Sequence, residues 1–283
     1  MGYRENRFAS LLIVAVVYIL AILLGFYAFY RVQGQIWLKI LVADVTATTF
    51  VFLFSCILKN ASVYDPYWSV QPVAILAPMA INSPSPSKWL LLLMITLWSI
   101  RLTSNWAYTF HGLGHQDWRY SQLHQSSGRL YPLVNFLGIH MFPTIVVYLC
   151  ILPAIYVMIE SPAFRPLCLL GFVISVGAAT LQLVADTQMH RYRKNRTTPF
   201  MEEGLWKYSR HPNYLGEILM WWGVAVYGIV LIGFRWYMVL GAAVNNLMFL
   251  FVSIPMADRR QAQKSGYEEY CKDKNRLLPL RFR

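Results

Sequence analysis

Long apolar runs recur along the whole chain, and short polar segments that carry most of the charge separate them. A run of about 20 apolar residues is long enough to cross the hydrocarbon core of a bilayer as a helix. The pattern therefore predicts an all-α fold, a polytopic membrane bundle of seven or eight transmembrane helices. The expected spans are 8–30, 36–58, 64–82, 88–110, 139–159, 165–186, 213–232 and 236–254.

Two of these runs need a further argument. The third contains Pro66, Pro72 and Pro78, and one interpretation is a broken or re-entrant helix, which leaves seven spans and one irregular segment. The first run follows two arginines, as in a signal peptide, but it is longer than the about 7–15 apolar residues of such a peptide and no small-residue cleavage site follows. We expect it to be retained as a span.

The composition supports the membrane interpretation, since 57% of the residues are hydrophobic and 13% are charged. The 18 Tyr and 10 Trp residues gather near the ends of the runs, as is typical of membrane interfaces. No polar stretch is long enough for a soluble domain, so residues 1–283 are predicted to form one membrane domain. The cysteines are scattered without the spacing of a disulfide framework or a metal site, and no metal is expected.

The positive charge is distributed unevenly between the two sides of the predicted bundle. With eight spans, 19 of the 25 Lys and Arg residues lie on the side that also holds both termini. The positive-inside rule places that side in the cytoplasm, for a protein of the bacterial inner membrane or the endoplasmic reticulum. The net charge of +12 is thereby attributed to topology and membrane lipid, and no nucleic-acid partner is expected. A monomer is expected.

The segment 204–217 concentrates polar chemistry where a basic loop enters an apolar helix. Pro212 suits the first turn of that helix, and Asn213 and Glu217 then share one helix face. The positive end of the helix dipole and the first-turn N–H groups favour an anionic ligand there. The candidate residues in this segment are Tyr208, Arg210, His211, Asn213, Tyr214 and Glu217.

A second candidate group surrounds Asp186, which ends an apolar span and opens a basic stretch with Arg191 and Arg193. Basic residues that reach from a helix end to lipid headgroups would not explain an acid at the apolar border. An acid that accepts from hydroxyl or amide donors, beside arginines that hold phosphates, explains both features. The C-terminal segment adds Asp258 and Arg259 on the same side, where we expect an ordered lid.

In the first half, Tyr64, Asp65 and Tyr67 place an acid and two phenols where a span begins. Asp65 is either a functional acid or the silent partner of Arg101 in a buried ion pair. The segment 117–120 either caps the same site or forms ordinary interface. Two more titratable residues at membrane depth are interpreted as structural: Asp44 and His140.

These motifs resemble a known family. The stretch 186–279 is similar to the C-terminal region of the membrane steroid 5α-reductases, and most similar to their bacterial branch of the DUF1295 type. The Asp-Pro-Tyr-Trp-Ser segment at 65–69 and Arg101 also resemble that branch. The residues that carry the resemblance are Asp186, Arg193, Gly204-Leu205-Trp206, Ser209-Arg210-His211-Pro212-Asn213-Tyr214, Gly216-Glu217, Tyr267, Tyr270 and Leu278-Pro279.

The resemblance implies a bundle that binds NADPH from the cytoplasmic side through its portion 186–283, without a Rossmann motif. Asn213 and Glu217 would contact the nicotinamide end. The ribose and diphosphate contacts would come from Asp186, Arg193 and Arg210, with Asp258 and Arg259 closing over them. Arg191, Tyr208, His211, Tyr214 and Arg101 are also assigned to the cofactor.

The resemblance also implies the reaction, hydride transfer to the β-carbon of a conjugated enone whose oxygen an acid group polarises. The nearest acid is Asp65 and the nearest phenols are Tyr64 and Tyr67, which we assign as catalytic for a steroid- or lipid-like substrate. Where the steroid enzymes carry a His/Arg cluster, this chain has Asp258-Arg259-Arg260.

Two alternatives stay open. The motif Arg-His-Pro-x-Tyr-x-Gly also occurs in membrane methyltransferases of the isoprenylcysteine type, which use S-adenosylmethionine. A non-catalytic lipid-binding protein with the same fold is the other alternative. The basic residues after Asp186 favour the reductase, because the three phosphates of NADPH need more cations than one S-adenosylmethionine.

Overall fold

A computed structural model describes residues 4–272 and 274–278. The chain divides into two compact units, Met1–Ser161 and Pro162–Arg283. Over the described ranges the regular structure is helical, apart from an isolated bridge between Ser209 and Asn275. The all-α prediction is confirmed.

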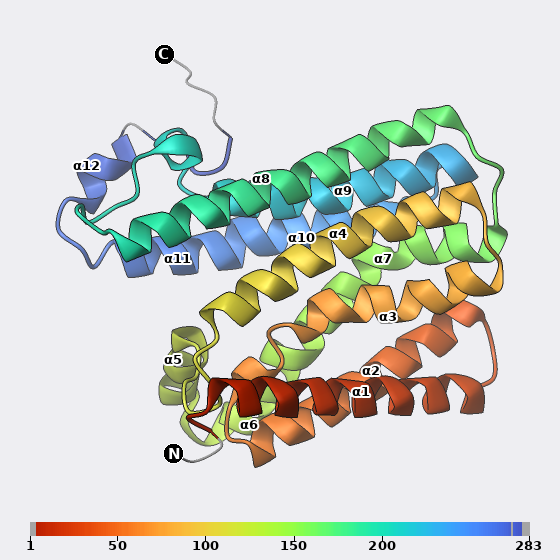
Figure 1. The fold of residues 1–283 in the computed structure, drawn as a ribbon, viewed down its shortest axis with the longest axis horizontal. Coiled ribbons are helices and arrows are strands. Elements are labelled where there is room, and N and C mark those ends of the chain that lie inside the picture. The colour runs from red at the N-terminus through yellow and green to blue at the C-terminus, as the bar shows by residue number, and fades with distance from the viewer. Residues whose placement is uncertain (1–3, 273, 279–283) are drawn as a thin grey trace. The chain divides into compact units, whose positions relative to one another are not determined.

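Among the described residues, unit 1 holds three long helices, a shorter one that carries two prolines, and a segmented stretch that ends in a further long helix (Figure 1). The helices are α1 (Arg7–Arg31), α2 (Ile36–Ile57), α3 (Tyr67–Asn82), α4 (Pro86–Thr109), α5 (Trp118–Ser127), α6 (Tyr131–Val134) and α7 (Phe142–Glu160). A π-helical stretch, Asn135–Met141, leads into α7.

Unit 2 contains a long antiparallel pair and a segmented third helix that runs along it (Figure 1). The helices are α8 (Leu169–Lys194), α9 (Pro212–Ile232), α10 (Leu240–Met248), α11 (Ile254–Gln261) and α12 (Tyr267–Lys272). A π-helical stretch, Phe249–Ser253, joins α10 to α11. Short 3-10 turns in the two units are Ala61–Val63, Gly128–Leu130, Pro166–Cys168, Gly204–Lys207 and Trp236–Met238.

Seven helical segments in the described part of the chain are long and apolar enough to cross a membrane, so the protein is a multi-pass membrane protein. They are Arg7–Arg31, Ile36–Ile57, Pro86–Thr109, Trp118–Glu160, Pro166–Lys194, Pro212–Ile232 and Trp236–Gln261. The run 64–82 is not among them. It forms α3, a 16-residue helix that begins after Pro66 and keeps Pro72 and Pro78 inside it, in line with seven spans and one irregular segment.

The polar end of unit 1 is fastened by long-range hydrogen bonds to backbone carbonyls. The guanidinium of Arg4 donates to the carbonyls of Leu58 and Leu113, at 3.1 and 3.2 Å. The amide of Asn60 donates to the carbonyls of Leu113 and His115, both at 2.9 Å. The start of α1, the α2–α3 connection and the segment after α4 therefore lie at one end of this unit.

Helices α8 and α9 pack closely because small residues face each other. A Cβ atom on Gly223 would lie 2.2 Å from Ser175 Oγ, and one on Gly171 would lie 2.5 Å from the Gly223 carbonyl oxygen. A Cβ atom on Gly216 would lie 2.4 Å from Gln182 Cγ. Such contacts are typical of membrane helices, whose association depends on close backbone approach.

Two helices extend further than the sequence pattern predicts. The span expected to end at Asp186 continues as α8 to Lys194, because no Gly or Pro interrupts residues 187–194. The last span, expected to end at residue 254, continues to Gln261. Pro255 normally ends a helix, but here the π-helical turn precedes it and Pro255 occupies the first turn of α11, where its missing N–H is tolerated. Arg191, Arg193 and Asp258 thus lie on helices and not in loops.

Candidate functional site

The 3-10 turn Gly204–Lys207, which precedes α9, is hydrogen-bonded to α8 beside Asp186. The Trp206 indole N–H donates to the Ala185 carbonyl at 3.0 Å, and the Leu205 N–H donates to Gln188 Oε1 at 3.0 Å. Gly204 has a φ of +58°, and a Cβ atom there would lie 2.4 Å from the Gln188 amide. Glycine at this position therefore serves both the turn and the close approach to α8.

Helix α9 begins with Pro212 in its first turn, as predicted. One turn later Glu217 is 5% exposed, and both of its carboxylate oxygens accept hydrogen bonds. The Gln182 amide donates to one at 2.7 Å, and the Trp221 indole donates to the other at 2.9 Å. These neutral donors from α8 and α9 fix the carboxylate in place, in a setting that the sequence alone did not reveal.

Asp258 on α11 gathers donors from three segments. Its Oδ1 accepts from the Tyr267 hydroxyl at 2.6 Å and lies 2.9 Å from His211 Nε2. Its Oδ2 lies 3.4 Å from Arg210 Nη1 and 3.6 Å from Arg276 Nε. This acid therefore holds the segment before α9 and the C-terminal segment together, through side chains that are mostly buried.

The C-terminal segment packs against residues 200–211 at several further points. The Tyr270 ring stacks on Phe200 with centroids 4.7 Å apart, and its hydroxyl donates to the Met201 carbonyl. The Arg210 N–H donates to the Asn275 carbonyl at 2.9 Å. The packing of this segment is described for residues up to 272 and for 274–278, whereas Pro279 lies outside the described residues.

The predicted cofactor residues of unit 2 fall into two groups. Buried or half-buried side chains are those of Asp186, Arg210, His211, Asn213, Tyr214, Glu217 and Asp258, and exposed ones are those of Tyr208, Arg191, Arg193 and Arg259. Arg210 Nε is buried and has no hydrogen-bond partner among the described residues. His211 stacks on Tyr214 with ring centroids 5.2 Å apart. The structure thus joins Arg210, His211 and Asp258 directly, and it adds Tyr267 and Gln182 to the predicted set.

The three predicted catalytic residues of unit 1 lie in different settings. The Tyr64 hydroxyl is buried and 2.7 Å from Thr144 Oγ1. The Tyr67 hydroxyl donates to Asp44 Oδ1 at 3.2 Å. Asp65 accepts a hydrogen bond from Tyr120 on α5, so the segment 117–120 contacts this acid. Arg101, predicted to contact cofactor or Asp65, lies half-buried on α4.

The Asp65 carboxyl has an altered acidity. Burial raises its pKa from the ordinary value of 3.8 to about 6, although the nearby Arg119 guanidinium and the Tyr120 hydroxyl act in the opposite direction. The folded protein therefore binds this proton more tightly than the unfolded chain does, and folding is favoured when the carboxyl is protonated.

We expect the melting temperature of the detergent-purified protein to fall as pH rises from about 4 to about 6, since the unfolded chain releases the Asp65 proton above its ordinary pKa of 3.8 whereas the folded protein holds it until its pKa of about 6. Asp65→Asn, which stays neutral, should flatten this part of the profile in a thermal melt monitored by tryptophan fluorescence. An unchanged slope in the variant would show that another group controls it.

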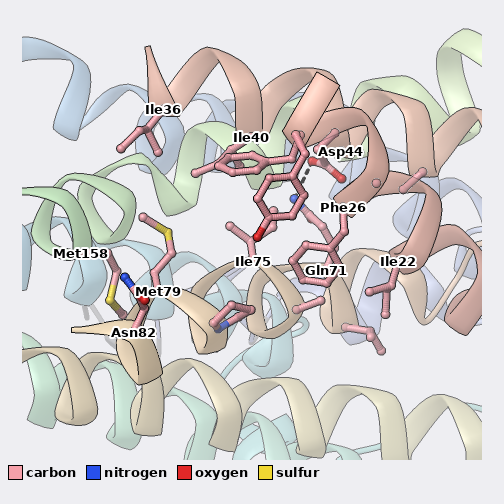
Figure 2. A pocket seen from close by; sticks show the side chains of 18 of the residues that line it. Ile22, Phe26, Ile36, Ile40, Asp44, Gln71, Ile75, Met79, Asn82 and Met158 are labelled. Atoms are coloured by element: carbon pink, nitrogen blue, oxygen red, sulfur yellow. Dashed lines mark hydrogen bonds between the residues drawn. The ribbon is translucent and has the colours of Figure 1, made fainter. Parts of the chain in front are cut away.

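A cavity of about 440 Å³ lies within unit 1, against α1, α2 and α3. Tyr67 lines it, whereas Tyr64 and Asp65 are not among its lining residues. Figure 2 shows Asp44 and Gln71 at one end of this cavity and Asn82 at the other. Its remaining wall is mainly apolar, formed by residues such as Ile22, Phe26, Ile40, Ile75 and Met79.

The polar end of this cavity is a connected group. Asp44 is 3% exposed, and besides the Tyr67 hydroxyl it accepts from the Gln71 amide at 2.5 Å. Sequence reasoning interpreted Asp44 as structural and did not single out Gln71. The available signal was a lone acid inside an apolar span, which by default indicates a functional site.

Over residues 4–272 and 274–278, no group of three or more His, Cys, Asp or Glu side chains is placed to hold a metal ion.

Comparison with known proteins identifies the family. The model described as "Protein of unknown function (DUF1295)" matches residues 51–275, and the chain belongs to this family. The chain is also similar to the Schizosaccharomyces pombe protein named "Uncharacterized protein C594.04c", with 27% identity over 202 residues. That match covers 61% of this chain and 58% of the relative, so the chain matches little more than half of the relative's length. No solved structure matches.

Proposed function

We propose that this DUF1295 protein is an NADPH-dependent membrane reductase and a member of the wider steroid 5α-reductase-like superfamily. Its reaction would be the reduction of a carbon–carbon double bond, conjugated to a carbonyl, in a lipid-like substrate. The observation that carries the proposal is the set of cations at one end of unit 2. Arg210 is held at the start of α9, and exposed arginines lie on the last turns of α8 and on α11.

These cations suit the phosphates of a dinucleotide. The exposed side chains of Arg191, Arg193 and Arg259 are available to anionic oxygens, and the buried Nε of Arg210 is a donor that an acceptor oxygen would satisfy. The first turn of α9 adds the positive end of a helix dipole. His211 at the N-cap makes no side-chain capping hydrogen bond to this turn. These four arginines suit the three phosphates of NADPH, whereas S-adenosylmethionine has no phosphate for them to bind.

The buried part of the same segment suits a neutral ring. Glu217 and Asn213 lie one turn apart on α9, and Glu217 is oriented by Gln182 and Trp221. A carboxylate held in this way can accept from the carboxamide of a nicotinamide while apolar side chains exclude water. We assign these two residues to the nicotinamide end and Asp186 to a ribose hydroxyl.

The substrate would occupy the cavity of unit 1. When bound, NADPH supplies a hydride, which would add to the β-carbon of the substrate while a proton adds to the α-carbon, so that the double bond is reduced and NADPH is oxidised to NADP⁺. Tyr67 lines the cavity and its hydroxyl donates to Asp44 Oδ1; on substrate binding this single hydrogen would turn from Asp44 to the carbonyl oxygen of the substrate. Asp65 and Tyr64 are not among the residues that line the cavity and would act through their neighbours.

The orientation is also proposed. The basic end of unit 2 and the polar end of unit 1 carry most of the Lys and Arg residues, so both ends, and both termini, are assigned to the cytoplasm.

Ligand protection tests the proposal. NADPH at about 100 times its dissociation constant should raise the unfolding free energy of the detergent-purified protein by about 2.7 kcal/mol, because only the folded state binds it. The melting temperature should rise with NADPH and stay unchanged with S-adenosylmethionine. Stabilisation by S-adenosylmethionine alone would make the protein a methyltransferase, and stabilisation by neither would favour the lipid-binding alternative.

The same measurement examines the phosphate contact. Arg193→Ala should weaken NADPH binding about ten-fold or more at low salt, and the difference should shrink as salt screens the charge. Arg165→Ala is the matched control: it removes the same charge at the other end of the α8–α9 pair, where Arg165 donates to the Val230 carbonyl. An equal effect of both variants would indicate a general loss of positive charge and not a phosphate contact.

A further inference from the structure

The amide of Gln71 has an unused hydrogen-bonding edge. Its nitrogen donates to Asp44 Oδ2 at 2.5 Å, which sets the orientation of the amide. The side chain is 3% exposed, and its Oε1 has no hydrogen-bond partner within the described part of the chain. A buried acceptor without a donor is costly, so this atom indicates a ligand group that donates.

Gln71 also keeps one amide hydrogen, because its nitrogen carries two and the bond to Asp44 uses one. The side chain therefore offers an acceptor and a donor attached to the same carbon. This edge is complementary to a carbonyl group that bears its own N–H or O–H. The ligand carbonyl accepts from the free amide hydrogen of Gln71, and the ligand N–H or O–H donates to Oε1. A ketone or an ester can accept from the amide hydrogen of Gln71 but has no hydrogen to donate, so Oε1 stays unpaired. An ionised carboxylate also lacks the donor, and Asp44 would repel it.

The shape of the cavity indicates what is attached to that group. The α3 residues that line it recur at helical spacing along one face, and this face is about 22 Å long at 1.5 Å per residue. They are Tyr67, Val70, Gln71, Ala74, Ile75, Pro78, Met79 and Asn82. An extended chain follows such a groove along its length better than a compact ring system does.

The other walls are compatible with entry from a bilayer. Phe26, Tyr30 and Ile36 line the cavity, belong to membrane spans α1 and α2, and are exposed by 37%, 77% and 41%. Exposed apolar side chains on a span face lipid tails, so a chain can reach the groove sideways while its polar head passes inward to Gln71.

We infer that the cavity of unit 1 binds a single-chain lipid whose head is a carboxamide, with the amide edge of Gln71 pairing with the head and the chain lying along α3. In naming a substrate class, a long-chain unsaturated amide, this rests on the proposed reductase function. The binding site itself requires neither NADPH nor turnover.

The experiment compares matched ligands on the wild-type protein in nanodiscs without NADPH. Binding of tritiated octadecanamide is measured by scintillation proximity, with unlabelled methyl octadecanoate as the competitor that lacks the donor. The amide should bind roughly ten-fold tighter than the ester, because the ester leaves Gln71 Oε1 unpaired. Equal affinities, or displacement of the amide by a steroid enone at a lower concentration than by the unlabelled amide, would overturn the inference.

Variants then locate the contact. Gln71→Leu should remove the preference for amide over ester, whereas Asn82→Leu, the same chemical change at the other end of the cavity, should keep it. A preference that survives in Gln71→Leu places the amide elsewhere and contradicts the inference. If Gln71→Leu does not fold, the ligand comparison on the wild-type protein decides the question alone. Stabilisation by NADPH is measured separately, so a failure of the reductase proposal and a failure of the amide-binding inference can be distinguished.

Discussion

Replacing Gly223 with leucine is expected to prevent stable packing of α8 against α9. The new Cβ atom would lie 2.2 Å from Ser175 Oγ and 2.8 Å from both the Gly171 carbonyl oxygen and the Ser175 nitrogen. Two of these three atoms belong to the backbone, so no side-chain rotation relieves the overlap and the helices must separate. We expect a loss of about 3 kcal/mol or more, seen as a lower melting temperature and a smaller monodisperse fraction in size-exclusion chromatography.

The control for this prediction is Gly177→Leu. Gly177 lies on α8, the helix that Gly223 of α9 packs against, and a Cβ atom there would meet no other atom within 4 Å, so the substitution changes apolar surface and helix propensity without a clash. Comparable melting temperatures for the two leucine variants would mean that α8 and α9 do not approach as closely at Gly223 as described.

Removal of the Asp258 carboxylate is expected to release the C-terminal segment from the start of α9. In Asp258→Ala, His211 and Tyr267 lose their acceptor, and the guanidinium groups of Arg210 and Arg276 lose their counter-charge. Breaking a largely buried group of this kind costs about 3 kcal/mol. Trypsin should cleave after Lys272 much faster than in the wild-type protein, and NADPH should bind more weakly.

Glu269→Ala provides the comparison. Glu269 lies in the same segment and pairs with Lys272, but the two side chains are 75% and 68% exposed, so this ion pair contributes little. Its removal should leave the cleavage rate and NADPH protection close to wild-type values. If Asp258→Ala behaves in the same way, the packing of the C-terminal segment depends on its aromatic contacts and not on the carboxylate.

Much of the fold was predictable, because hydrophobic span length is a strong signal. The expected spans coincide with the observed ones to within a few residues at most ends. Two differences are larger: the span expected at 139–159 is part of a helical stretch that begins at Trp118, and the run 64–82 forms α3, which is not among the spans. The differences at the ends of α8 and α11 arise where an apolar pattern stops but the helix does not. Residues 187–194 are polar yet carry no helix breaker, and a π-helical turn admits Pro255. Hydropathy shows where the apolar run ends, and at these two positions the helix ends several residues later.

The candidate sites were predictable only in part. The motif around Pro212 correctly predicted the start of α9, since the residues that carry it are adjacent in sequence. The partners that fix these side chains come from distant positions: Gln182 is 35 residues from Glu217, and Asp258 is 47 residues from His211. The pairing of Asp44 with Gln71 was not predictable for the same reason, because it joins two residues 27 positions apart on different helices. Helix packing decides such pairs, and no local pattern encodes them.

The wide turn at Phe249–Ser253 determines which way Asp258 faces. In an α-helix each residue turns the chain by about 100°, so the count of residues between α10 and α11 sets the azimuth of every later side chain. The direction of the carboxylate is thereby set by the number of residues in the π-helical stretch, and side-chain replacements that keep this number can preserve the direction. The gain or loss of a single position there would swing the carboxylate by about a quarter of a revolution, and with it the fastening of the C-terminal segment.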